Sequence, residues 1–198
     1  MVLALKRMHR KIGRHQEQAK PLTRDILDQL LQQCDNNAKG HRDRVLLLLG
    51  YETMRRRSEL CNSKFEDLTH LPGRGHAIRL MRSKTDQEGL SKLIPISAQL
   101  HSLIKEWHQK YELEGTILRS VDRHGNVGDK LNSGSIGTIL NRLKANSGSH
   151  ENNCRFSGHS FRVGAAIDLL EAGVSLETIM LKGGWRSQDN AMNYLRSW

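Results

Sequence analysis

The sequence has little of what marks secreted, membrane-spanning or metal-binding proteins. Its 198 residues include only three cysteines, Cys34, Cys61 and Cys154, which lie far apart and form no Cys-x-x-Cys pair. This spacing predicts neither a disulfide framework nor a zinc site, and it fits a reducing cytoplasm. No apolar run approaches the ~18 residues of a membrane-spanning helix, and the apolar stretch at residues 1–5 is too short for a signal peptide. Clusters of carboxylates or of Cys and His ligands are also missing, so we expect a cytoplasmic protein without a membrane or a metal.

Positive charge is what the chain has in excess. Its formal net charge is +10 at pH 7, which indicates a polyanionic partner, most often nucleic acid. A generally basic, solubilising surface is the alternative. Residues 1–20 are especially basic and poor in apolar residues, so we interpret them as an arm or linker that either follows DNA phosphates or is a disordered terminus. Its basic residues, set against the single acid Glu17, are Lys6, Arg7, Arg10, Lys11, Arg14 and Lys20.

Apolar periodicity predicts a mainly helical fold with one small antiparallel β-sheet, an α+β domain over residues 21–198. Residues 45–49 are too apolar for a surface helix and predict a central core helix. The predicted helices lie near residues 26–34, 41–51, 58–62, 100–111, 136–143, 159–170, 175–183 and 187–195. The predicted strands are residues 65–68, 77–81 and 92–96.

Helix ends and one core face can also be predicted. Thr23, Ser175 and Ser187 are expected N-caps, because a hydroxyl can accept a hydrogen bond from the first turn. Gly173 is expected just past a helix end, where glycine is favoured. The expected core face of the helix before it consists of Val163, Ala166, Leu169 and Leu170.

A histidine and an arginine stand three residues apart where that same helix is expected to begin. His159 and Arg162 then share one helix face. Such a face offers a proton-handling imidazole beside a guanidinium that can grip a phosphate with two parallel hydrogen bonds. Alone the pattern is a weak signal, because most such pairs are ordinary surface or capping residues.

Further positions suit chemistry on a phosphate. Arg56 follows a very apolar helix and needs a partner, which Glu59 can supply three residues on. Lys84 lies on a polar hairpin tip, where a lysine can deliver a proton. Tyr194 can act as an oxygen nucleophile, and Trp185 follows two glycines. Three of these residues have a structural alternative. Lys84 can be an ordinary hairpin-tip lysine, Tyr194 a packing tyrosine and Trp185 a core tryptophan.

In order and spacing, these residues resemble the sequence boxes of the tyrosine recombinases, the phage integrase family that includes Cre and the XerC/XerD proteins. The first box is similar to residues 56–60 (Arg-Arg-Ser-Glu-Leu), and the hairpin lysine is similar to Lys84 in Ser-Lys-Thr. The second box is similar to residues 157–162 (Ser-Gly-His-Ser-Phe-Arg). The last is similar to Gly-Gly-Trp at 183–185 followed by Tyr194. The resemblance implies the catalytic-domain fold of this family.

The resemblance also implies a mechanism of DNA cleavage. Tyr194 attacks the scissile phosphodiester, which gives a 3′-phosphotyrosine and frees a 5′-hydroxyl. Arg56 and Arg162 hold the non-bridging oxygens as negative charge builds. Lys84 protonates the leaving oxygen, and His159 accepts or shares the tyrosine proton. The 5′-hydroxyl of a partner strand then attacks the phosphotyrosine, and strands are exchanged.

Partners and cofactors follow from the same resemblance. Trp185 supports the phosphate through its indole N–H and by packing. Bond energy is kept in the covalent intermediate, so neither a nucleotide cofactor nor a metal is needed. The implied partner is double-stranded DNA. The protein is expected to be bacterial or phage-encoded, associated with the nucleoid, and to serve DNA integration or site-specific recombination by a mobile genetic element.

The chain departs from the family pattern at both ends. Relatives carry an N-terminal core-binding domain, and residues 1–20 resemble the linker that follows it. Many relatives also continue well beyond the tyrosine, whereas four residues follow Tyr194 here. We therefore expect a homo-tetramer on DNA for a full-length protein and a monomer for this chain. Two alternatives stay open: religation of the original strand, as in a type IB topoisomerase, and a truncated DNA-binding remnant without catalysis.

Overall fold

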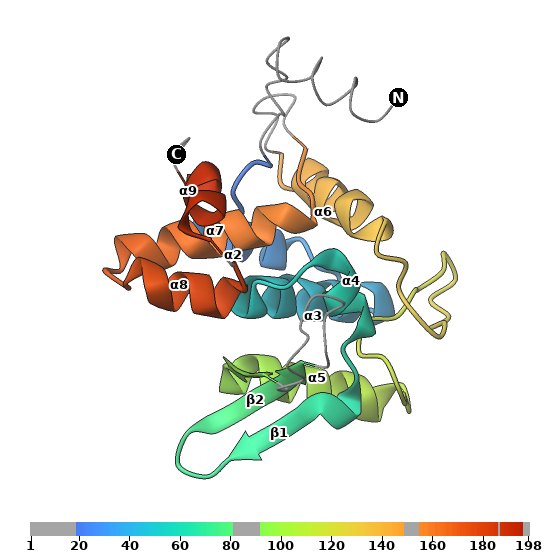
Figure 1. Cartoon of the computed structure of the whole chain (residues 1–198). Helices are drawn as coiled ribbons and strands as arrows, with labels where there is room; N and C mark the ends of the chain where they lie inside the picture. Colours follow the sequence, from blue (N-terminus) through green and yellow to red (C-terminus); the bar gives the residue numbers. More distant parts are fainter. Residues whose placement is uncertain (1–18, 81–91, 149–154, 186, 196–198) are drawn as a thin grey trace, which may run out of the picture.

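The computed structural model describes residues 19–80, 92–148, 155–185 and 187–195. Within them the chain is mostly helical with one small antiparallel sheet, which confirms the predicted fold class (Figure 1). The helices are α2 (Arg24–Gln32), α3 (Ala38–Thr53), α4 (Arg57–Asn62), the short 3-10 helix η1 (Phe65–Asp67), α5 (Ala98–Lys110), α6 (Ser135–Asn146), α7 (Gly158–Glu171), α8 (Leu176–Gly183) and α9 (Gln188–Leu195). The strands are β1 (Leu68–Leu71), β2 (Gly75–Leu80) and β3 (Lys92–Ile96). None of the helices in these ranges is long and apolar enough to cross a membrane.

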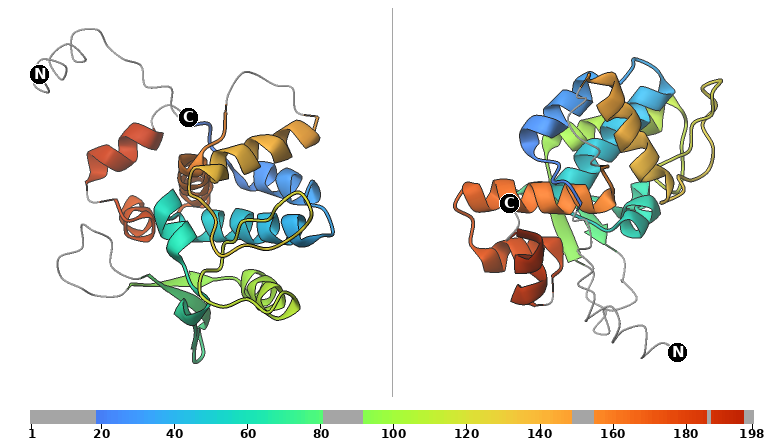
Figure 2. Two further views of the ribbon diagram at one scale, coloured as in Figure 1. Left: turned by 90° about the vertical axis from the view of Figure 1, so that its right-hand side faces the viewer. Right: turned by 90° about the horizontal axis from the view of Figure 1, so that it is seen from above.

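Helix α3 is the centre of the fold, as its apolar run predicts. Residues 45–49 are at most 2% exposed, so the middle of this helix is surrounded by other elements. It contacts α2, α5, α7 and β3. In the ribbon it lies between α7 with α8 on one side and the sheet with α5 on the other (Figures 1 and 2). The helices that carry the predicted site are therefore packed against the most buried element of the domain.

The three strands form a sheet in the order β1–β2–β3. Leu68 pairs with Ile78, and Ile78 in turn pairs with Ile94. Ile78 and Ile94 are buried in the main core, whereas Arg79, the residue that follows Ile78 in β2, is exposed. The alternation predicted for the second strand is therefore confirmed at these residues.

The first predicted strand, residues 65–68, is wrong except for its last residue. Residues 65–67 form η1 instead. The Asp67 carboxylate accepts a hydrogen bond from the Lys64 backbone N–H over 2.8 Å, which stabilises this single turn of helix. A short polar side chain that binds the backbone locally in this way competes with strand pairing.

Two details of the helices differ from the prediction. Leu170 is 47% exposed and is not part of the core face, because the buried residues of α7 belong to its first half, where it crosses α3. Thr23 occupies the N-cap position of α2, but its side chain makes no capping hydrogen bond. The predicted cap at Ser175 is confirmed, since its hydroxyl accepts from the Thr178 backbone N–H over 3.4 Å. Gly173 has the expected left-handed backbone, with φ of 78°.

Candidate functional site

The N-terminal ends of α4 and α7 lie directly against one another. A Cβ atom built at Gly158 would stand 2.0 Å from Cγ of Arg57, so the stem of the arginine passes over the bare glycine backbone. A side chain at this position would require the Arg57 side chain to move. The sequence between them spans about half the chain, and the fold brings the first and second boxes together.

Arg56 is the N-cap residue of α4 and is held from its own helix. Its Nη1 donates to Oε1 of Glu59 over 3.0 Å, and its backbone N–H donates to Oε2 of the same carboxylate over 3.2 Å. The expected pair is therefore present. The arginine side chain is 51% exposed, and an ion pair so exposed contributes only about 0–1 kcal/mol to stability. Its effect is to fix the direction of a guanidinium that still faces solvent.

Arg55, unlike Arg56, is buried within the domain. Arg55 is 7% exposed. Its Nε donates to the Thr53 carbonyl over 2.8 Å, and its Nη2 donates to the carbonyl of Lys182 near the end of α8. Arg55 thereby joins the chain after α3 to the end of α8, a structural role that the sequence did not reveal. The only signal was the run of three arginines, which does not say which one turns inward.

The first turn of α7 is fixed by serines. The Ser157 hydroxyl accepts from the His159 backbone N–H over 3.2 Å, and the Ser157 backbone N–H donates to Oγ of Ser160 over 3.0 Å. This is a capping box with serine in both positions. His159 is exposed, whereas Arg162 is only 5% exposed. At the same end of the helix, the Arg162 side chain is therefore buried and the His159 side chain lies at the surface.

Trp185 lies over the guanidinium of Arg162. The Cζ atom of the arginine is 4.7 Å from the centre of the ring, which is cation–π geometry. The tryptophan ring also covers Gly183, where a Cβ atom would stand 2.2 Å from a ring carbon. Gly184 then turns the chain with a left-handed φ of 71°. The two glycines that precede Trp185 thus allow the close ring contact and the turn.

The pKa of His159 is affected by burial and by nearby cations. Partial desolvation lowers its pKa from 6.5, and the positive charges of Arg162, Arg57 and Arg56 lower it further. At pH 7 the imidazole is therefore neutral and able to accept a proton. Residues from α4 and α7 act together on this one side chain.

The remaining predicted residues are placed only in part. Tyr194 belongs to α9, whose backbone packs against α7, but its side chain lies outside what the structure describes. Lys84 lies outside the described residues. The strand that follows it is linked to the site region, because Nζ of Lys92 donates to the carbonyl of Leu181 in α8. Of the six basic residues in the arm, Lys20 is described and half-buried, and the others lie outside the described ranges.

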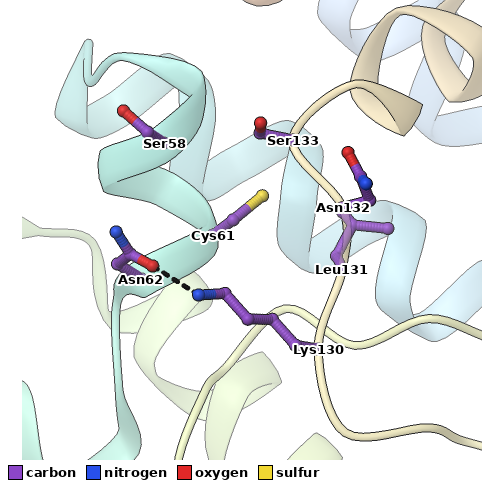
Figure 3. A pocket seen from close by; sticks show the side chains of 7 residues that line it. All are labelled: Ser58, Cys61, Asn62, Lys130, Leu131, Asn132 and Ser133. Carbon is purple, nitrogen blue, oxygen red and sulfur yellow. Dashed lines mark hydrogen bonds between the residues drawn. The ribbon is translucent and has the colours of Figure 1, made fainter.

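A pocket of about 410 Å³ lies beside the site helix α4 (Figure 3). It opens between α4 and the loop before α6, and Nζ of Lys130 crosses it to Oδ1 of Asn62 over 2.6 Å. Of the predicted catalytic residues whose side chains the structure describes, none lines it. In the part of the chain that the structure describes, no group of three or more His, Cys, Asp or Glu side chains could hold a metal ion.

The sequence of the chain is similar to those of known proteins. The sequence matches the phage integrase family over residues 20–198. The chain therefore belongs to the phage integrase family. Its relatives include the recombinase Cre of Escherichia phage P1, 27% identical over 93% of this chain, and an integrase/recombinase XerD homologue of Selenomonas ruminantium, 28% identical over 97% of it. The chain spans 58% of the length of each of these two relatives.

Solved structures show the same fold. A XerA recombinase superposes with a TM-score of 0.69 at 16% identity, covering 90% of this chain and 60% of that one. A lambda integrase dimer bound to a COC′ core site gives a TM-score of 0.66 at 20% identity, covering 91% of this chain and 49% of that one. The described helices and sheet are thus the architecture of a tyrosine recombinase catalytic domain.

Proposed function

We propose that this chain is the catalytic part of a site-specific DNA recombinase that cleaves a strand through Tyr194 and leaves a 3′-phosphotyrosine. The observation that carries the proposal is the convergence of Arg56, His159, Arg162 and Trp185 from three separate stretches of the chain. The cation–π contact between Trp185 and Arg162 and the approach of Arg57 to Gly158 support this convergence. The lowering of the His159 pKa by Arg162, Arg57 and Arg56 is consistent with it. The helix that carries Tyr194, α9, packs against α7, which also carries His159 and Arg162.

The two arginines suit a transferring phosphate. A guanidinium binds phosphate oxygens with parallel hydrogen bonds, and fixed positive charge stabilises the extra negative charge of the transition state. Arg56 is aimed by Glu59, and Arg162 is covered by the ring of Trp185. Each guanidinium is therefore oriented before DNA arrives, which reduces the reorganisation that the reaction requires.

Proton transfers are assigned to His159 and Lys84. A free tyrosine has a pKa near 10, so Tyr194 must lose its proton as it attacks. His159 is a suitable acceptor, because its lowered pKa keeps it neutral. Lys84 is proposed to protonate the leaving 5′ oxygen. The 5′-hydroxyl of a second strand then displaces the tyrosine, and one phosphodiester is exchanged for another without a nucleotide cofactor.

Double-stranded DNA is the proposed substrate. The net charge of +10 supports it, as do solved relatives described as bound to DNA, among them a lambda integrase tetramer on a Holliday junction. Lys6, Arg7, Arg10, Lys11, Arg14 and Lys20 are proposed to contact DNA phosphates. Because the chain spans little more than half of its relatives, a homo-tetramer on DNA is proposed for a whole protein only.

Covalent trapping tests the proposal. The chain is mixed with a nicked half-site DNA carrying its candidate attachment sequence, so that cleavage releases a short fragment and the phosphotyrosine cannot be reversed. A denaturing gel should show a slow protein–DNA band that Tyr194→Phe abolishes while DNA binding is retained. Tyr111→Phe, at the C-cap of α5, is the matched control and should form the band. A band that persists in Tyr194→Phe would refute the assignment of the nucleophile.

The gel does not distinguish recombination from religation of the original strand. Two distinguishable DNA sites answer that question. Exchange joins ends from different sites, whereas topoisomerase-like religation restores the parental strands and changes only the linking of a supercoiled plasmid.

A further inference from the structure

The stretch that leads into α2 runs along α7. We call residues 22–24 the lead-in segment. The Leu22 backbone N–H donates to the carbonyl of Ser160 over 2.9 Å. One turn further, a Cβ atom built at Gly164 would stand 1.9 Å from the Leu22 carbonyl oxygen. Two stretches of backbone therefore touch without a side chain between them, and Gly164 is what allows it.

A second anchor lies one more turn along the same helix. Oδ2 of Asp168 accepts from the Arg24 backbone N–H over 2.8 Å and from the hydroxyl of Tyr51 over 2.5 Å. Arg24 is the first residue of α2, whose N-cap Thr23 supplies no side-chain hydrogen bond. The carboxylate from α7 thus takes over that capping role, and its negative charge suits the positive end of the α2 dipole.

The three contact points form one line on α7. Ser160, Gly164 and Asp168 are four residues apart, so they lie on one face of the helix. Eight residues of helix span about 12 Å. Two anchors separated by that length hold both the position of α7 along its axis and its tilt. His159 and Arg162 stand in the first turn of this same helix.

We propose that the lead-in segment sets the position of α7 and that Asp168 is thereby a positioning residue for the reaction at the other end of the helix. This inference rests on the proposed function and adds a residue to it. Asp168 does not touch the reacting atoms. It acts through the rigid rod of α7, so that displacement of the lead-in segment displaces the imidazole and the guanidinium together.

The expected size of the effect follows from the geometry. At Gly164 the obstructing atoms belong to the backbone of Leu22, so they cannot rotate away as a flexible side chain would. An added methyl group at 1.9 Å forces the helix and the segment apart by more than 1 Å. A misplacement of about 1 Å in a catalytic group can cost about 100-fold in rate. Gly164→Ala is therefore expected to slow cleavage by about 100-fold.

Substitutions of Asp168, the second anchor, should slow cleavage to different degrees. Asp168→Asn keeps an oxygen that can accept both hydrogen bonds but loses the charge, whereas Asp168→Ala loses both. The order of cleavage rates should be wild type, then Asp168→Asn, then Asp168→Ala. Glu171→Gln is the matched control for charge, because Glu171 is exposed on the same helix. Gly137→Ala is the matched control for glycine, because a Cβ atom there meets only the Phe156 carbonyl at 3.5 Å.

Each variant is measured in three ways after circular dichroism has shown that it is folded. These are the rate of covalent trapping on nicked half-site DNA, the DNA affinity by fluorescence anisotropy, and the pKa of His159 by NMR. The imidazole signal is assigned with His159→Gln. Desolvation lowers the pKa of His159, and the charges of Arg57 and Arg56 lower it further. Movement of α7 away from these two arginines, with more solvent around the imidazole, should raise the measured value toward 6.5, although Arg162 moves with His159.

The expected result is slower trapping and a raised His159 pKa in Gly164→Ala and Asp168→Ala, with DNA affinity within about twofold of wild type, since the phosphate contacts remain. The two control variants should match wild type. An unchanged His159 pKa in both anchor variants overturns the positioning role. If the wild-type chain traps no DNA while the anchor variants still shift this pKa, the positioning stands and the proposed function falls.

Discussion

The described residues form two hydrophobic clusters of very different size, which differ in what they contribute to the predicted site. The main core is built around α3 and joins α2, α5, α6 and the sheet. The second cluster has four fully buried members, Met54, Ala165, Ala166 and Ile179, which join the end of α3 to α7 and α8. Trp185 packs against this second cluster. Leu60 and Cys61 of α4 and Phe161 of α7 belong to the main core, so both clusters support the predicted site. The second cluster is the one that holds Trp185, and substitutions in the two clusters should therefore differ in their balance of stability and trapping.

The largest loss of stability is expected from Asp43, on the main-core side. Its carboxylate is 1% exposed and lies between Arg42, at 2.7 Å, and Arg142. Removing it leaves the buried cation of Arg42 without its carboxylate. Asp43→Ala should lower the free energy of unfolding by about 3–5 kcal/mol, measured by urea denaturation. A loss below 1 kcal/mol would mean that water reaches this network.

A cavity in the main core should cost nearly as much. Leu47 is fully buried in α3, and Leu47→Ala is expected to lower the free energy of unfolding by about 2–5 kcal/mol. At a temperature where the variant is still folded, its covalent trapping of nicked DNA should be close to wild type, because the second cluster is intact. Strong loss of trapping in the folded variant would contradict this difference between the two clusters.

The same kind of cavity in the second cluster should cost less stability but lower covalent trapping more than the cavity at Leu47. Ile179 on α8 is fully buried but surrounded by partly exposed neighbours that can collapse toward it. Ile179→Ala is expected at the lower end of the range, about 2 kcal/mol. Trapping should nevertheless fall by about 100-fold, because α8 positions Trp185 over Arg162. Denaturation and trapping measured on the same preparation give both values.

Acidic pH should weaken both regions. Burial lowers the pKa of His41 and His101 in the main part of the domain, and desolvation with neighbouring arginines lowers that of His159. The unfolded chain, with histidine pKa near 6.5, then binds protons more readily than the folded one. Stability is therefore fully present well above pH 6.5 and is lost as the pH falls from about 6.5 toward the lower pKa values of the folded state. Urea denaturation at pH 7.5 and 5.5 measures this loss, and His159→Gln should remove only part of it.

The smallest change in stability, with a large change in function, is expected at Arg56. Its ion pair with Glu59 is half-exposed, so Arg56→Gln should alter the free energy of unfolding by less than about 1 kcal/mol. Loss of a charge that stabilises the transition state should lower trapping by about 10²–10³-fold. Arg74→Gln, in the exposed β1–β2 turn, is the control and should change neither. Equal stability and equal trapping in Arg56→Gln would remove this residue from the site.

Much of the fold can be predicted from the sequence. The features that cannot be predicted have identifiable physical reasons. The apolar run at 45–49 predicts the central helix, and the order of boxes predicts which residues meet. The 3-10 turn before β1 was missed because Asp67 binds its own backbone locally, which apolar periodicity does not register. Exposure of Leu170 depends on where α7 leaves α3, a tertiary fact.

Capping by Asp168 was also beyond sequence reasoning. The carboxylate and the Arg24 N–H that it caps are separated by 144 residues, and local rules assign such a cap to Thr23. The inward turn of Arg55 is a similar case, because its acceptor is a backbone carbonyl that any residue at position 182 would offer. Side-chain types carry information about the active site, whereas these supports rest on backbone atoms that sequence patterns do not distinguish.

The three consecutive arginines have a consequence for the order of folding. Arg56 pairs with Glu59 three residues further along the chain. By contrast, Arg55 binds a carbonyl 127 residues later, and the Arg57 side chain packs against Gly158 in α7. Contacts between distant parts of a chain form late, because long loops must close first. A nascent chain that has folded only through α6 would hold one arginine in place and possess no site. The cluster of Arg56, Arg162 and Trp185 is therefore expected to form late in folding, once α7 has packed against α3 and Gly158 has reached Arg57.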